Sequence, residues 1–280
     1  MSDELNSNWK TPVWKVSKSA GQLKRVLRVK EAQAIINNID VQKQGLFKIM
    51  KLSNGDARRW LFALLLSGMR LSELIRLKQN PYDIDGNPLF RSNGSILLPY
   101  ETFGLKGKQK IVEKERVVIL SNIGRKKMAE FLDEKTQMPY FKNGFNSEYV
   151  MILFDSILKA SAEKIGLPTR TFTRTQKKPV MNDITKQQKI DENGKPIFQK
   201  ISVTQTTTGV MCRSFRSSWE SWLMSSKEKG DDLAMFNILK SIGHSEETAR
   251  GYYLVSEFDE EDIADMKKVT AGFGTFKKEE

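Results

Sequence analysis

The sequence has few of the residues on which thiol and metal chemistry depend. Its 280 residues include one cysteine, Cys212, and one histidine, His244. A zinc site made of cysteine and histidine needs three or four such ligands, so that class of site is excluded. The single cysteine excludes an internal disulfide and fits an intracellular protein. We therefore expect no metal and no cofactor.

Motifs of several common enzyme and membrane classes are also missing. The chain has no Gly-x-x-x-x-Gly-Lys-Ser/Thr loop for nucleotide phosphates and no Gly-x-Ser-x-Gly elbow for a serine nucleophile. Its longest apolar run, 60–66, is far shorter than the roughly 20 residues that cross a bilayer, and its first residues lack the order of a signal peptide. We therefore expect a cytoplasmic protein with no membrane partner, associated with the nucleoid or, if it comes from a virus, inside a host cell.

Positive charge is abundant and unevenly distributed. Lys and Arg number 46 and Asp and Glu 34, a formal net charge of +12. The basic residues cluster in 101–130 and 169–200, whereas the chain after 253 is acidic until its last lysines. Clusters of this kind are typical of a surface that binds DNA phosphates. For any single cluster a solvated surface is the alternative, and a salt-dependent affinity for DNA distinguishes the two.

The hydrophobic pattern predicts a mainly α fold with a small antiparallel β-hairpin or sheet. Apolar residues three or four apart predict helices at about 28–39, 56–68, 122–132, 149–165, 208–224, 232–242 and 259–269. Two apolar segments, 95–99 and 116–120, predict a pair of strands. We expect an arm or linker over 1–27, a main domain over 28–258 and a tail over 259–280. The basic stretch 169–208, with a turn at 191–194, is expected to be an inserted hairpin against DNA.

Four segments in fixed order carry the candidate chemistry. They are GMRLSEL at 68–74, a lysine-bearing hairpin at 105–118, RSFR at 213–216, and IGH at 242–244 followed by two tyrosines at 252–253. Their order resembles the tyrosine recombinases of the phage-integrase family, which cut and rejoin DNA through a phosphotyrosine. The family box Gly-x-Arg-x-Ser-Glu-Leu is matched at every fixed position. The box His-x-Leu-Arg is matched at Arg216, with Phe215 for leucine, but Arg213 stands where the family has histidine.

The resemblance implies a role for each candidate catalytic residue. Arg70 and Arg216 would hold the non-bridging oxygens of the scissile phosphate, because planar guanidinium groups suit that task. His244 would contact the same phosphate. Tyr253, nine positions after His244, would be the nucleophile, with Tyr252 in reserve. Arg213 would stabilise the phenolate or the phosphate, although a permanently protonated arginine is a poor general base.

The predicted hairpin lysines have two roles. Lys106, with Lys108 as second choice, would protonate the leaving 5′ oxygen. Lys108, Lys110, Lys177 and Lys178 are expected to contact DNA. Glu73, three residues after Arg70, is interpreted as the partner that orients Arg70. The alternative is that Arg70 and Glu73 form a structural ion pair with no catalytic role.

The resemblance therefore implies a tyrosine-recombinase catalytic domain over 28–258 that integrates, excises or resolves duplex DNA as part of a mobile genetic element. It implies a homo-tetramer on DNA, with the 259–280 tail docking on a neighbouring subunit. Arg213 motivates an alternative, a DNA-binding accessory protein of the same fold that has lost cleavage. A DNA-relaxing enzyme resembling the type IB topoisomerases is a third possibility.

Overall fold

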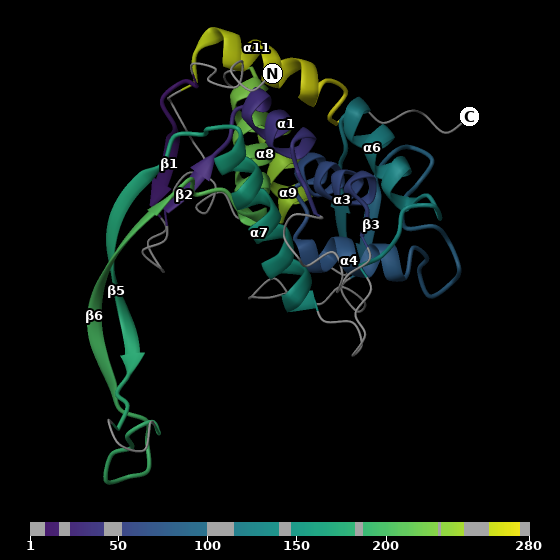
Figure 1. Ribbon diagram of the computed structural model, residues 1–280. Coiled ribbons are helices and arrows are strands. Elements are labelled where there is room, and N and C mark those ends of the chain that lie inside the picture. The colour runs from purple at the N-terminus through teal and green to yellow at the C-terminus, as the bar shows by residue number, and fades with distance from the viewer. Residues whose placement is uncertain are drawn as a thin grey trace.

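The structure is a computed structural model that describes residues 9–16, 23–41, 52–99, 115–139, 147–182, 187–228, 231–243 and 258–274. This part of the chain is mainly helical, with small antiparallel sheets of two strands (Figure 1). The helices are α1 (Val29–Asn37), α3 (Asn54–Ser67), α4 (Leu71–Gln79), α6 (Asn122–Leu132), α7 (Ser147–Lys164), α8 (Cys212–Ser226), α9 (Asp232–Ile242) and α11 (Glu260–Thr270). Within these ranges every helix is too short or too polar to span a membrane.

Helix α3 lies in the middle of the helical body, as its nearly continuous apolar surface predicts. Trp60 is 1% exposed and packs edge-on against Phe131 of α6. Ser53 is the N-cap, and its Oγ accepts a hydrogen bond of 3.0 Å from the Asp56 backbone N–H. The Ser53 side chain thus satisfies one of the free N–H groups at the start of the helix, and Asp56 lies within the first turn.

Helix α8 is the second buried helix and packs against α3, α11 and strand β2 (Leu23–Val26). Phe215, Trp219 and Trp222 are almost fully buried. The indole N–H of Trp222 donates to the Leu27 carbonyl at 2.7 Å. Trp219 and Trp222 are therefore core residues. Helix α8 is therefore enclosed on most sides.

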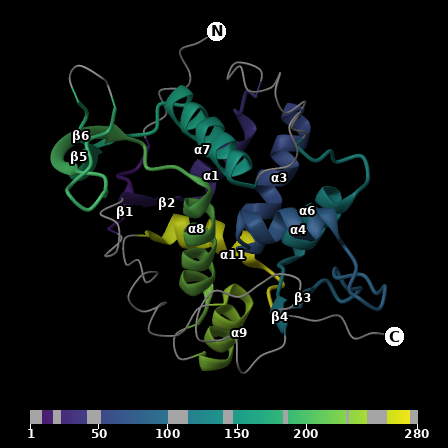
Figure 2. The same cartoon turned by 90° about the horizontal axis from the view of Figure 1, so that it is seen from below.

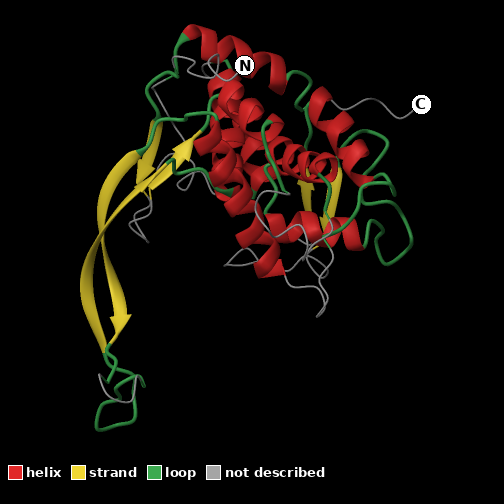
Figure 3. Ribbon diagram, viewed as in Figure 1, coloured by secondary structure: helices red, strands yellow, loops and turns green. Residues whose placement is uncertain are grey.

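The strands form three antiparallel pairs in the described ranges (Figure 3). The predicted pair is present as β3 (Ile96–Pro99) and β4 (Glu115–Val118), and the basic stretch forms the long hairpin β5 (Arg170–Pro179) and β6 (Phe198–Thr207). The pair β1 (Val13–Val16) and β2 was not expected, because it lies in the segment interpreted as an arm. Val13 is 1% exposed and the Trp9 indole donates to the Ile165 carbonyl, so this segment is packed on the body.

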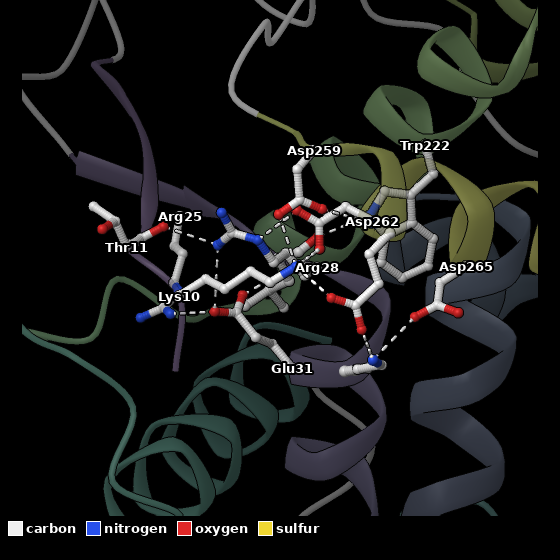
Figure 4. A network of polar contacts seen from close by, with 12 residues as sticks. Lys10, Thr11, Arg25, Arg28, Glu31, Trp222, Asp259, Asp262 and Asp265 are labelled. Carbon is white, nitrogen blue, oxygen red and sulfur yellow. Dashed lines mark hydrogen bonds and ion pairs between the residues drawn. The ribbon is translucent and has the colours of Figure 1, made fainter. Parts of the chain in front are cut away.

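A network of ion pairs joins the N-terminal segment to helix α11 (Figure 4). Arg28 donates to Asp262 at 2.8 Å, and Lys10 lies 2.8 Å from both Asp259 and Glu261. Buried Met266 anchors α11 in the core of its own chain. Docking of the 259–280 tail on a neighbouring subunit stays a prediction, since one chain does not test it.

The junction after α3 requires glycine. Gly68 has a φ of +62°, and a Cβ there would lie 2.6 Å from Cδ1 of buried Trp219. We expect Gly68→Ala to reduce the free energy of unfolding by about 2–5 kcal/mol, as left-handed strain adds to overpacking. Urea unfolding measures this.

Gly86→Ala is the matched control, because Gly86 also has a positive φ (+82°) but a Cβ there meets nothing within 4 Å. It should cost only about 1–2 kcal/mol. Equal losses for the two variants would contradict close packing of Trp219 on Gly68.

Candidate active site

Arg70 lies at the junction between two helices. Gly68 ends α3, and Arg70 is the extended residue that precedes α4. The two helices fix the backbone on either side, so the direction of the arginine is set by the fold. Its side chain is 41% exposed, which leaves it accessible to a ligand.

The Glu73 carboxylate holds Arg70 in place. Its Oε2 accepts from the Arg70 backbone N–H at 2.7 Å, and its Oε1 accepts from Arg70 Nη1 at 2.8 Å. The first bond also satisfies a free N–H group at the start of α4. The interpretation of Glu73 as the partner of Arg70 is thus confirmed in its geometry, whereas a catalytic role for Arg70 is untested by this contact.

Arg116 of β4 forms an ion pair with the same carboxylate. Its Nη2 donates to Glu73 Oε2 at 2.7 Å, and its Nη1 donates to the Ile242 carbonyl at 3.3 Å. Sequence reasoning placed Arg116 in a strand and gave it no site role. A usable signal was available, because Arg116 opens the apolar run RVVIL at 116–120 and a buried arginine needs a partner. It is only 5% exposed.

Arg216 reaches the same place from the second turn of α8. Its Nη1 donates to the Gly68 carbonyl at 2.7 Å, and its Nη2 donates to the Ile242 carbonyl. These carbonyls lie at the C-terminal ends of two different helices, α3 and α9. The helix dipole makes a C-terminal end partly negative, so it attracts a cation. Four segments that are far apart in the sequence therefore meet at one point, near residues 68, 116, 216 and 242. Figure 2 shows α8 and α9 beside each other, with α4 and β4 nearby.

Charge within this cluster shifts the acid–base behaviour of its members. Burial alone would raise the pKa of Glu73, but Arg116, Arg216 and Arg70 lower that pKa to about 2. Burial lowers the pKa of Arg216 to about 10, although the Glu73 carboxylate opposes this shift. At neutral pH the carboxylate is therefore ionised and Arg216 is protonated. Glu220, a second buried carboxylate, also raises the pKa of Arg216. Three guanidinium groups against these two carboxylates still leave an excess of positive charge, which favours an anion.

The remaining predicted site residues are distributed as follows. Arg213 lies one turn before Arg216 on α8 and is exposed. Lys177 and Lys178 lie on β5, in the part of the hairpin that extends away from the helical body (Figure 1). Five predicted residues lie outside the described ranges, together with the reserve Tyr252: Lys106, Lys108, Lys110, His244 and Tyr253.

The end of α9 brings the chain to the arginine cluster immediately before His244. Gly243 has a φ of +72° and ends the helix, and a Cβ there would lie 3.0 Å from Cδ of Arg116. The preceding carbonyl, that of Ile242, accepts from both Arg116 and Arg216. A larger residue at 243 would thus press on Arg116.

Comparisons of the chain with models of protein families, with curated proteins and with solved structures found no match. The described residues include no group of three or more His, Cys, Asp or Glu side chains placed to hold a metal ion. What this arrangement offers chemically is therefore a set of guanidinium donors fixed around one point. Such donors suit a phosphate.

Because the pKa of Glu73 is low, the free energy of unfolding should depend on pH, and this dependence tests the role of the carboxylate. The folded-state pKa lies below the ordinary value of 4.5, so this carboxylate stabilises the fold above about pH 4.5, and the contribution is lost as pH falls toward 2. We expect Glu73→Gln to lower the free energy of unfolding at pH 7 by about 3–5 kcal/mol, because Arg116 loses its buried partner. The variant should also lose much of the pH dependence between 4.5 and 2 in urea unfolding.

Glu130→Gln is the control, since Glu130 pairs with Lys127 at 2.7 Å near the surface. It should cost less than about 1 kcal/mol. A Glu73→Gln protein with unchanged stability and an unchanged pH profile would contradict the central role of this carboxylate.

Proposed function

We propose that this chain cleaves and rejoins duplex DNA as a site-specific recombinase of the tyrosine-recombinase type. The observation that carries the proposal is the meeting of Arg70 and Arg216 at one point, although they are 146 positions apart in the sequence. Both lie in segments that match the family's boxes, and the IGH segment at 242–244 begins at the same point, where the Ile242 carbonyl accepts from Arg216.

In the proposed reaction the Tyr253 oxygen attacks a backbone phosphorus. The Tyr253 phenol gives its proton to solvent water as a bond forms between its oxygen and phosphorus. The bond to the 5′ oxygen breaks at the same time, and the 5′ oxygen takes a proton from Lys106. The reverse attack by a 5′ hydroxyl rejoins the strand. Because the phosphotyrosine retains the energy of the phosphodiester, the reaction needs no nucleotide hydrolysis.

The described residues would act on the charge of the transition state. Extra negative charge develops on the non-bridging oxygens, and preorganised donors stabilise it without moving. Arg70 is the accessible donor, held by Glu73 on one side. Arg216 is fixed by two backbone carbonyls. Arg116 neutralises the Glu73 carboxylate, so that this carboxylate repels the incoming phosphate less.

One observation favours a second candidate function, a DNA-binding accessory protein without cleavage. The exposed Arg213 occupies the position of the family's histidine, and arginine does not act as a base at neutral pH. It can still stabilise a phenolate. The two functions differ in whether a covalent protein–DNA intermediate forms.

Nicked suicide duplexes, which trap a covalent intermediate when the cleaved fragment diffuses away, test the proposal. We expect the wild-type chain to give a covalent band on a denaturing gel that is absent for Tyr253→Phe and present for Tyr252→Phe. Arg70→Lys should slow formation of the band by about a hundredfold or more, because one preorganised donor is lost.

Arg59→Lys is the matched control, as Arg59 is similarly exposed and also pairs with a carboxylate three residues away in the sequence. It should leave the rate unchanged. Salt-sensitive binding of DNA by the wild-type chain without any covalent band would support the accessory function instead. The absence of both binding and a covalent band would reject both candidates.

A further inference from the structure

The β5–β6 hairpin extends from the helical body as an isolated ribbon (Figures 1 and 3). Each strand has ten residues, so the paired region is about 33 Å long. Among the described residues neither strand pairs with a third strand. A lone two-stranded ribbon is at best marginally stable in water. Its length and exposure therefore suggest that a ligand covers it during function.

A buried arginine, Arg25, anchors both strands of this ribbon to the body at its base. The Arg25 backbone N–H donates to the Gly209 carbonyl, just after β6, at 3.3 Å. Its Nη1 donates to the Pro168 carbonyl, just before β5, at 2.8 Å, and its Nη2 pairs with Glu31 at 2.6 Å. Figure 4 shows this arginine beside Glu31. The base of the ribbon is thus fixed where the chain enters α8, the helix of Arg213 and Arg216.

The pairing register divides the ribbon into two faces. Successive residues of a strand point to opposite sides, and directly opposed residues share a side. One side carries hydroxyl and lysine side chains along most of its length, and these residues are here called the hydroxyl face: Thr171, Thr173, Thr175, Lys177, Lys200, Ser202, Thr204 and Thr206. Pro179 and Phe198 follow on the same side at its outer end. The described residues of this face are exposed, and Thr171 and Thr206 hydrogen-bond across the strands at 2.8 Å.

The other face has a different character. It carries Phe172, Ile201 and Val203, which are half-buried. Lys178 belongs to this face, because it follows Lys177 directly. The two lysines predicted as DNA contacts therefore point in opposite directions, and a ligand on the hydroxyl face contacts Lys177 alone of the two.

Lys177 and Lys200 lie directly opposite each other on the hydroxyl face. Like charges in this position destabilise a strand pair. In the described part of the chain neither lysine has a carboxylate within ion-pair distance. An anion between them would relieve the repulsion. Lysine and the hydroxyls of serine and threonine are also common donors to DNA phosphates.

We propose that the hydroxyl face binds duplex DNA, with Lys177 and Lys200 on either side of a backbone phosphate. The major groove of B-DNA admits a two-stranded ribbon, whereas that of double-stranded RNA is too deep and narrow for side chains to read. The ribbon is about as long as one helical turn, roughly 34 Å. It therefore extends the contact with DNA by up to one turn beyond the arginine cluster. This inference rests on the proposed function only in taking DNA as the substrate.

Equilibrium binding of the full chain to a duplex of about four helical turns, over a range of salt concentrations, tests this inference. For Lys177→Gln/Lys200→Gln we expect the log–log slope of affinity against salt to become shallower by about 2, since two phosphate contacts are lost. The matched control is Arg170→Gln/Lys178→Gln, which removes the same charge from the opposite face. The control slope should stay at the wild-type value.

Equal changes in both double variants would overturn the assignment to one face, as would an unchanged slope for Lys177→Gln/Lys200→Gln. Tighter binding of a duplex RNA of the same length would overturn the choice of DNA. Hydroxyl-radical footprinting adds a positional readout. The wild-type and control footprints should be about one turn longer than that of Lys177→Gln/Lys200→Gln.

Failure of this inference is distinguishable from failure of the recombinase proposal. The covalent band on suicide duplexes reports cleavage, whereas the salt dependence of equilibrium binding reports the contacts of the two lysines. A wild-type chain that binds DNA through the two lysines without forming that band would support the hydroxyl face and reject cleavage. A chain that forms the band with no contribution from the lysines would do the opposite.

Discussion

The ion pairs of the Glu73 carboxylate are the interaction on which the candidate site depends. This one group is bonded to Arg70 at the start of α4 and to Arg116 in β4, and it lowers the electrostatic cost of bringing Arg216 close. Without it, guanidinium groups from three elements would repel one another in a partly buried place. The position of the site is thus set by packed helices and a strand, which favours preorganised electrostatic chemistry over a site assembled from loops.

A second charged network has a comparable role on the other side of α8. Arg25 and Glu31 are both buried, and Arg28 pairs with Asp262 of α11. Together they join the N-terminal strands, α1, α11 and the base of the β5–β6 hairpin. Helix α8 lies between the two networks. Contacts of the hairpin with a ligand and contacts of the arginine cluster with a phosphate would therefore be made by parts that are both joined to α8 or to the segment that enters it.

Local patterns in the sequence predict most of the helices and the long hairpin, whereas contacts between distant segments are not visible in them. The three- and four-residue spacing of apolar side chains gives α1, α3 and α9 to within a few residues. Strands β1 and β2 have four residues each and no clear alternation, so their pairing depends on the body beneath them. Arg116 and Arg25 acquire their partners only through the fold. The order of the motifs predicted the segments that meet at Arg70 and Arg216, but not the carboxylate and carbonyls that hold them.

A crystal structure of the chain bound to a nicked DNA duplex tests the central claim most directly. The account predicts one backbone phosphate within about 3 Å of guanidinium nitrogens of both Arg70 and Arg216, with the Arg70–Glu73 and Arg116–Glu73 ion pairs intact. Arginines that contact different phosphates, or none, would contradict it.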